Sequence, residues 1–208
     1  MPELESLISF AIASVALLVI PGPAVIYIVN RSVASGRSIG LASVLGLELG
    51  TFMHVIAATV GLSAILATSV EAFNTVKFLG ASYLIVVGLS TLLRRPQALN
   101  TSADLITKIQ ALRQGFIINT LNPKVALFFL SFLPQFIDPG KSSNALQSLA
   151  FGSVFVIFGF ITDGIYALCA SSLRETLVKG KALPFVQRYV AGVVFVLLGI
   201  MAASAKIS

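Results

Sequence analysis

The sequence contains few of the groups that enzymes and metal centres use. Only 11% of its 208 residues are charged, against about 25% in an ordinary soluble domain. The single cysteine, Cys169, excludes an intramolecular disulfide, and because it lies in an apolar run we expect a buried, inert thiol. No HExxH, CxxC or nucleophile-elbow motif occurs. We therefore predict no catalytic residue, no metal site and no cofactor.

Three further absences restrict the functions that this sequence can support. Residues 1–30 contain no Lys or Arg, and Glu3 and Glu5 stand where a secretory signal would be basic, so the first apolar run is predicted to be a retained helix. Residues 139–142, with the sequence PGKS, resemble the end of a phosphate-binding loop, but Gln135 stands where that loop requires glycine. The net charge of +6 is scattered over short gaps rather than gathered in a basic stripe, so no nucleic-acid partner is predicted.

Apolar residues, in contrast, are in excess. They make up 57% of the chain, against about 45–50% in soluble domains, and a core of this size could not hide them all from water. A membrane-spanning helix needs about 20 mainly apolar residues. The sequence therefore predicts an all-α membrane protein, one domain over 1–208, with transmembrane helices near 7–30, 39–67, 76–93, 115–137, 146–171 and 187–204.

The basic residues predict the orientation. Ten Lys and Arg side chains lie in the first, third and fifth gaps between the helices, and three lie on the other side. The positive-inside rule then places the odd-numbered gaps in the cytoplasm and both termini outside. The long third gap, 94–114, is predicted to be either an amphipathic helix on the membrane interface, with Leu105, Ile109 and Leu112 on its apolar side, or a solvated linker.

The first and fourth predicted helices are interrupted by proline at mid-span, by Pro21-Gly22-Pro23 and by Asn122-Pro123-Lys124. Each interruption opens a set of three helices, over about 1–93 and about 115–208. An odd number of helices inverts the second set, so the pattern predicts a 3+3 inverted repeat, whose broken helices typically form the binding site of a transporter.

Proline lacks an N–H group, so carbonyl groups near each break, among them those of Leu17, Val19 and Asn119, lose their helical donor. Such carbonyls can accept from a substrate ammonium group, while the N-terminus of the following half-helix favours a carboxylate. A zwitterion such as an amino acid meets both requirements. The simpler alternative is a plain proline kink, which membrane helices tolerate.

Ionisable residues lie at the same depth as the breaks. Glu48, Lys124 and Asp163 each lie eight or nine residues from the predicted cytoplasmic end of their helix, about 12–14 Å deep and near the middle of the bilayer. Such groups are costly in lipid and indicate function. Asp163 and Glu48 are candidates for proton coupling, although either could instead form a structural ion pair with Lys124. His54, about 240° around the helix from Glu48, is predicted to pack through a hydrogen bond.

Tyr166 shares a helix face with Asp163, and Asn119 precedes the second break. Glu48 lies between Gly46 and Gly50, which would let another helix approach closely and keep the carboxylate away from lipid. The candidate substrate-binding residues are Pro21, Gly22, Pro23, Glu48, Asn119, Asn122, Pro123, Lys124, Asp163 and Tyr166.

Taken together, several motifs resemble the lysine exporter / homoserine–threonine resistance (LysE/RhtB) family. They are Pro21-Gly22-Pro23, Gly36-Arg37 through Gly40-Leu41 to Gly46 and Gly50, the run from Lys77 to Leu84 with Gly88, Asn122-Pro123-Lys124, and Phe132-Leu133-Pro134-Gln135-Phe136. The resemblance implies proton-driven efflux of amino acids or their derivatives through a bacterial inner membrane, with lipid and a small-molecule substrate as partners. Glycine pairs such as Gly152 with Gly159 and Gly192 with Gly199 could pack helices within one chain or between two chains of a homodimer, and the sequence leaves both open.

Glu48 departs from this resemblance, because uncharged polar residues are commoner there in the homoserine–threonine branch. A carboxylate at this position favours a cationic amino acid, or is simply protonated. Other functions remain open: export of another solute or a cation on the same scaffold, an intramembrane enzyme using Asp163, Glu48 or His54, or a structural or receptor protein. A cation exporter would need clustered ligands, and an enzyme would need a nucleophile or metal beside its base.

Overall fold

A computed structural model describes residues 2–68, 70–93, 105–138, 143–172, 188–189 and 191–204, and every regular element in these ranges is helical. This confirms the all-α class, and each predicted stretch is helical over most of its described length. In chain order the elements are α1 (Leu4–Leu18), α2 (Pro23–Ser35), α3 (Arg37–Thr68), α4 (Val70–Leu93), α5 (Lys108–Thr120), α6 (Pro123–Ser131), the 3-10 turn η1 (Leu133–Phe136), α7 (Asn144–Ser172) and α10 (Ala191–Ser204).

Two of these helices are long and apolar enough to cross a membrane individually: α3 over Arg37–Gly61 and α7 over Asn144–Ser172. Two bent pairs qualify when each is taken as one span: α1 with α2, bent by 56°, and α5 with α6 and η1, bent by 44°. The described residues therefore contain up to four spans. α4 and α10 are not among them, and the 14 described residues of α10 extend about 21 Å, short of a ~30 Å hydrocarbon core. The six-span inverted repeat remains a prediction.

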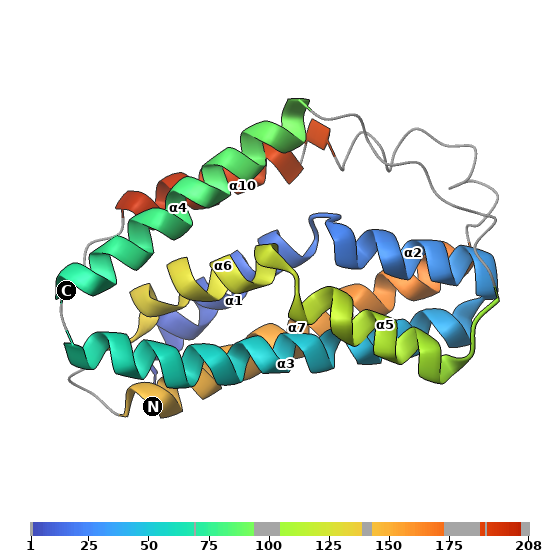
Figure 1. The fold of residues 1–208 in the computed structure, drawn as a ribbon, viewed down its shortest axis with the longest axis horizontal. Helices are drawn as coiled ribbons and strands as arrows, with labels where there is room; N and C mark the ends of the chain where they lie inside the picture. Colours follow the sequence, from blue (N-terminus) through green and yellow to red (C-terminus); the bar gives the residue numbers. More distant parts are fainter. Residues whose placement is uncertain are drawn as a thin grey trace.

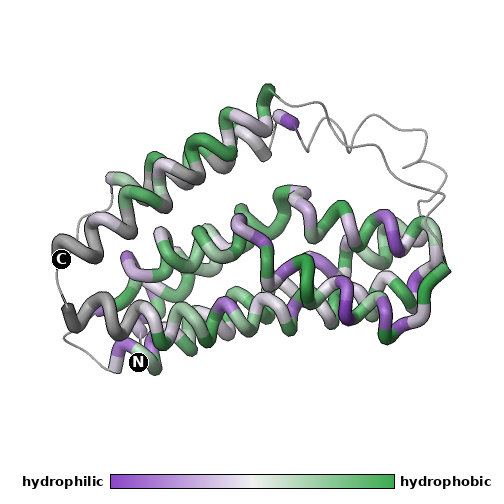
Figure 2. The backbone as a smooth tube through the Cα atoms, viewed as in Figure 1, coloured by the Kyte–Doolittle hydropathy of each residue, from purple (hydrophilic) through white to green (hydrophobic). Residues whose placement is uncertain are grey.

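The outer faces of the helices are apolar, as lipid requires. Leu4, Ile8 and Ile12 project from α1 at helical spacing, and Ile157, Ile161 and Ile165 from α7, all of them exposed. In Figure 2 the helices are largely green, with a purple stretch where α5 meets α6. Besides the polar segments on α2, on α5 and at the ends of the bundle, polar residues thus occur at a helix break.

Cys169 lies on this outer surface, so the predicted buried thiol is wrong. It is six residues, about 240°, around α7 from the buried Asp163, whereas Ala167 and Ala170 complete the inward face. An apolar run in a membrane helix has a lipid-facing side as well as a packed side, and apolar neighbours alone do not distinguish the two.

Glycines bring α3 and α5 into backbone contact. A Cβ atom on Gly46 would overlap the backbone of Leu112, and one on Gly115 would lie 2.6 Å from the carbonyl oxygen of Ser43. A Cβ atom on Gly50 would lie 2.8 Å from the backbone nitrogen of Thr120. The prediction that Gly46 and Gly50 admit another helix is therefore confirmed, and that helix is α5.

The second broken helix begins earlier than its predicted start at residue 115. The hydroxyl of Thr107 accepts a bond from the backbone N–H of Gln110, and the Gln110 side chain accepts one from the backbone N–H of Thr107. This capping box starts α5 at Lys108. Residues 108–114 therefore extend the broken helix. Of the three residues predicted to share an apolar side, Leu105 and Ile109 are exposed, whereas Leu112 is half-buried and its backbone packs against Gly46 of α3. Residues 94–104 of the predicted linker lie outside the described residues.

The two ends of the bundle differ. The N- and C-termini lie at the same end (Figure 1), while the turn between α2 and α3 lies at the other. That turn passes through Gly36, whose φ of 85° is readily adopted only by glycine. The α4–α10 pair is joined by close contacts of Gly88, Gly192 and Gly199, and α7 meets α3 through Gly152 and Gly159, so these glycines pack helices within one chain.

Candidate functional site

The two helix breaks lie side by side although about 100 residues separate them in sequence (Figure 1). The ammonium group of Lys124, in the first turn of α6, donates a 2.8 Å hydrogen bond to the carbonyl oxygen of Ile20, at the end of α1. One side chain thus connects both interruptions directly.

At the first break the chain leaves the helix after Leu18 and re-enters it at Pro23, with Gly22 as the N-cap. Pro23 is at the first helical position, where its missing N–H group costs nothing. The carbonyl oxygen of Val19 accepts a 2.7 Å bond from the Tyr166 hydroxyl of α7, whereas that of Leu17 accepts from the backbone N–H of Ile20. The carbonyl oxygens of Val19 and Ile20 therefore accept hydrogen bonds from side chains of other helices, Tyr166 and Lys124.

At the second break, Asn122 caps α6 by accepting from the backbone N–H of Lys124, at 3.0 Å, and Pro123 takes the first helical position. The Asn119 carbonyl oxygen lies 2.8 Å from Nε2 of His54 and also accepts from the backbone N–H of Asn122. Because a carbonyl only accepts, Nε2 of His54 carries the proton. His54 therefore has the predicted hydrogen-bonding role at a carbonyl that proline deprives of its helical donor.

Buried amides connect this break to α3. Asn119 donates through Nδ2 to Oγ1 of Thr51, at 2.7 Å, and to the carbonyl oxygen of Leu47, at 2.8 Å. Asn122 donates to Oδ1 of Asn119 at 3.0 Å. Unpaired amides are expensive in an apolar interior, so these bonds hold the break in one geometry.

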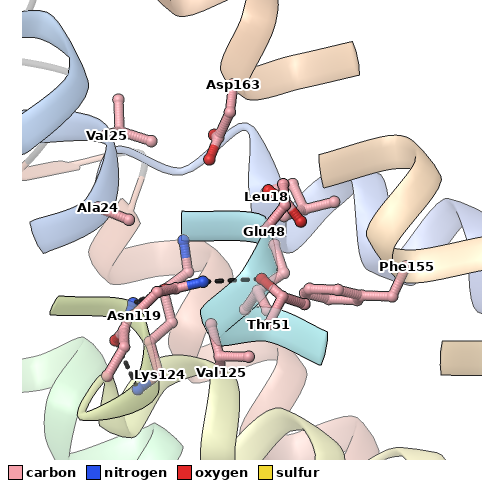
Figure 3. A pocket seen from close by; sticks show the side chains of 12 residues that line it. Leu18, Ala24, Val25, Glu48, Thr51, Asn119, Lys124, Val125, Phe155 and Asp163 are labelled. Atoms are coloured by element: carbon pink, nitrogen blue, oxygen red, sulfur yellow. Dashed lines mark hydrogen bonds between the residues drawn. The ribbon is translucent and has the colours of Figure 1, made fainter. Parts of the chain in front are cut away.

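A small cavity lies where the breaks meet α3 and α7 (Figure 3). It encloses about 20 Å³, enough for about one water molecule, so an amino acid would require the surrounding helices to move apart. The lining residues are Leu17, Leu18, Ala24, Val25, Glu48, Thr51, Asn119, Asn122, Lys124, Val125, Phe155 and Asp163.

Two carboxyl groups enter this space from opposite helices, Glu48 from α3 and Asp163 from α7 (Figure 3). They are 2% and 5% exposed. Asp163 interacts electrostatically with both Glu48 and Lys124. Glu48 and Asp163 were both predicted as possible ion-pair partners of Lys124. The electrostatic interaction of Lys124 is with Asp163.

Glu48 packs closely against α7 because the residue that it contacts there, Gly159, has no side chain. A Cβ atom on Gly159 would lie 2.6 Å from both Oε1 and Oε2 of Glu48. Oε2 is buried and has no hydrogen-bond partner among the described residues. Because a buried carboxylate oxygen without a donor is costly, this atom calls for a proton or a ligand.

The structure brings five of the predicted site residues to one cavity: Glu48, Asn119, Asn122, Lys124 and Asp163. Tyr166 and Gly22 lie beside it, Tyr166 on the Val19 carbonyl and Gly22 against the Lys124 side chain. Pro21, Pro23 and Pro123 do not line the cavity; they shape the chain around it.

The other lining residues were not among the substrate-binding residues predicted from the sequence. Thr51 lies one turn beyond Glu48, and Phe155 lies two turns before Asp163, so helical spacing from the two carboxylates could have found both. Leu17, Leu18, Ala24, Val25 and Val125 are apolar residues at the breaks, and nothing in their type distinguishes them from core.

An aromatic cluster closes the cavity on the side of the termini. Phe155 packs 5.1 Å from Phe128, ring centre to ring centre, and Phe128 packs 5.7 Å from Phe10. Phe151 lies 5.0 Å from Phe10, so α1, α6 and α7 all contribute rings. These buried side chains place a continuous apolar layer between the charged groups and the end of the bundle that holds both termini.

A cavity that contains charged and amide side chains, between two broken helices inside an apolar bundle, is typical of a membrane translocator. The family model of the LysE type translocators matches residues 15–206, and the chain belongs to this family.

Several curated proteins are similar along most of their length. An uncharacterized membrane protein of Vibrio cholerae is 26% identical over 200 residues, covering 96% of this chain and 97% of the relative. One of Pseudomonas aeruginosa is 29% identical, covering 82% and 79%. The homoserine/homoserine lactone efflux protein of Salmonella typhimurium is 28% identical over 200 residues, covering 95% and 96%. No solved structure matches the chain.

Proposed function

We propose that this multi-pass membrane protein exports amino acids or amino-acid derivatives from the cytoplasm of a bacterium by secondary active transport. The observation that carries the proposal is the cavity itself, where two carboxyl groups and one ammonium group converge, and where this ammonium group bonds a carbonyl oxygen of the other helix break. The similarity to a homoserine/homoserine lactone efflux protein supports the same class of substrate.

The cavity provides a partner for each end of an amino acid. Asp163, Glu48 and the carbonyl oxygens of Val19 and Ile20 can accept from the substrate ammonium group. Lys124 can receive its carboxylate, aided by the N-terminus of α2, where Gly22 provides no capping side chain. The substrate therefore binds at mid-depth, between the two halves of the predicted inverted repeat.

The carboxyl pair also supports coupling to protons. Two carboxylates in one apolar site repel each other, and a proton on either one relieves the repulsion. A positively charged substrate group has the same effect, so proton and substrate compete for the pair. Such competition is what an exchange of an incoming proton for an outgoing amino acid requires.

The export assay uses cells that lack their own amino-acid exporters and are loaded with a panel of dipeptides. We expect the protein to increase release of one or a few amino acids, and Asp163→Asn to reduce that release more than about tenfold, because it removes one of the two acidic groups. Asp138→Asn makes the same chemical change outside the cavity and is expected to leave release near wild type. Equal release with and without the membrane-inserted protein, for every amino acid, would contradict amino-acid export and favour another solute or cation.

Proton coupling requires a separate measurement in inside-out membrane vesicles. An imposed gradient, acidic inside the vesicle, should drive accumulation of the exported amino acid, and a protonophore should abolish the accumulation. Accumulation that is unaffected by collapse of the gradient would show that transport is not coupled to protons.

A further inference from the structure

One of the protein's own groups takes a position in the site that suits a substrate ammonium group. The Lys124 side chain runs from α6 across to the first break, where Nζ lies 2.8 Å from the carbonyl oxygen of Ile20. Its Cδ and Nζ atoms lie 3.3 Å and 3.7 Å from the position of a Cβ atom on Gly22. The missing side chain of Gly22 therefore leaves the space in which the Lys124 chain lies.

The groups around Nζ are those that bind an ammonium ion. The Ile20 carbonyl lies where the helix is interrupted, and Asp163 provides the opposite charge. The neighbouring carbonyl of Val19 accepts from Tyr166. With the Lys124 ammonium in place, the cavity has only about 20 Å³ left, so a second ammonium group at these acceptors requires Lys124 to move.

We propose that Lys124 is a tethered substitute for the substrate ammonium group, which occupies the Ile20 carbonyl and balances Asp163 whenever the carrier is empty. The proposal rests on the proposed function and adds a mechanism to it. The arriving substrate displaces Nζ from Ile20, and the substrate carboxylate becomes the new partner of the Lys124 ammonium. The net charge of the layer is then the same with and without substrate, and Asp163 faces an ammonium group in both states.

This exchange of partners makes a specific kinetic prediction. A carrier that releases its substrate returns without it, and a proton on one carboxyl group leaves the other charged. Without Lys124, this charge and the Ile20 carbonyl would face an apolar interior with no ammonium partner. Burial of such groups is costly, so the form without substrate should cross slowly. In a carrier that crosses loaded in both directions, the substrate ammonium group pairs with Asp163 and the Ile20 carbonyl, and the N-terminus of α2 remains for the substrate carboxylate.

The test uses Lys124→Met, which keeps an unbranched chain of similar length without the charge, and Lys124→Arg as the matched control that keeps the charge. Purified proteins are reconstituted in liposomes with the amino acid identified by the export assay. Exchange is measured with labelled substrate on one side and unlabelled substrate on the other, and net efflux with substrate on one side only.

We expect wild type and Lys124→Arg to perform both reactions. Lys124→Met also loses its partner for the substrate carboxylate, so both reactions are compared at saturating substrate, where it should lose about tenfold more of net efflux than of exchange. Equal loss of both reactions in Lys124→Met, with the protein monodisperse in detergent, would overturn the proposal in favour of direct substrate binding or structural support. Net efflux at the wild-type rate would overturn it as well. Absence of both reactions in wild type would instead reject the proposed function.

Discussion

The carboxylate of Glu48 occupies space that is free only because residue 159 is glycine. A Cβ atom on Gly159 would lie 2.6 Å from both carboxyl oxygens of Glu48, closer than real Cβ contacts come. The glycine therefore decides whether an acid of this length can lie between α3 and α7. Glycine spacing in α7 indicated only close packing, and its partner became known when both helices were placed.

Gly159→Ala should push the Glu48 carboxylate away from the cavity and reduce export on the order of tenfold, because displacement of a reacting group by about 1 Å is costly. Gly164→Ala is the matched control in the same helix, since nothing lies within 4 Å of its Cβ position. In the double variant, Glu48→Asp shortens the acid by about 1.5 Å and should restore part of the activity. Full export by Gly159→Ala alone would show that the position of Glu48 is unimportant.

At the helix breaks, the sequence predicts which carbonyl groups lose a helical donor but not which side chains replace it. Proline chemistry predicted that the carbonyls of Leu17, Val19 and Asn119 would lose their regular helical donor. Leu17 accepts instead from the nearby backbone N–H of Ile20, whereas Val19 and Asn119 each accept from a side chain of another helix. The donors themselves, Tyr166 and His54, come from α7 and α3. No local pattern in the sequence identifies a hydrogen bond between residues so far apart in the chain.

The crossing of α3 and α5 holds the second break in place. Gly46 and Gly115 allow the two backbones to touch, and Asn119 then reaches the carbonyl oxygen of Leu47 and the hydroxyl of Thr51. Small residues at such a contact are the usual means of packing helices in lipid. The position of the candidate site thus depends on a glycine contact away from any charged group.

Gly46→Ala should destabilise the protein by about 1–3 kcal/mol, because the added methyl group overlaps the backbone of Leu112, which cannot rotate away. Gly61→Ala in the same helix meets open space and should be neutral or slightly stabilising, since alanine is the better helix former. Thermal unfolding in detergent, followed by size-exclusion chromatography, compares the two. An unchanged melting temperature for Gly46→Ala would show that the helices can separate without cost.

The predicted orientation of the whole molecule rests on the distribution of basic residues and can be tested independently of transport. Both termini lie at the end of the bundle opposite the turn at Gly36 (Figure 1), and the positive-inside rule predicts that this end faces out of the cytoplasm. Glu3 and Ser38 are exposed residues near opposite ends.

A labelling experiment first replaces the exposed native cysteine by Cys169→Ser. In that background, a membrane-impermeant maleimide added to intact cells should modify Glu3→Cys but not Ser38→Cys, and permeabilisation should make Ser38→Cys reactive. The reverse pattern would show that the termini are cytoplasmic and that the charge rule fails for this chain.

The sequence by itself determined that lipid surrounds the helices, that the fold is all-helical, and at which positions along the helices the polar groups lie. Apolar runs of spanning length require helices, proline removes a helical donor at each of the two breaks, and a constant rise per residue predicts a common depth for Glu48, Lys124 and Asp163. Only the tertiary structure decided which of these groups meet, that Lys124 reaches the Ile20 carbonyl, and that Cys169 faces outward. The physical reason is that depth depends on position along a helix, whereas contact depends on how each helix is rotated and packed, which distant residues such as Gly46 and Gly159 control.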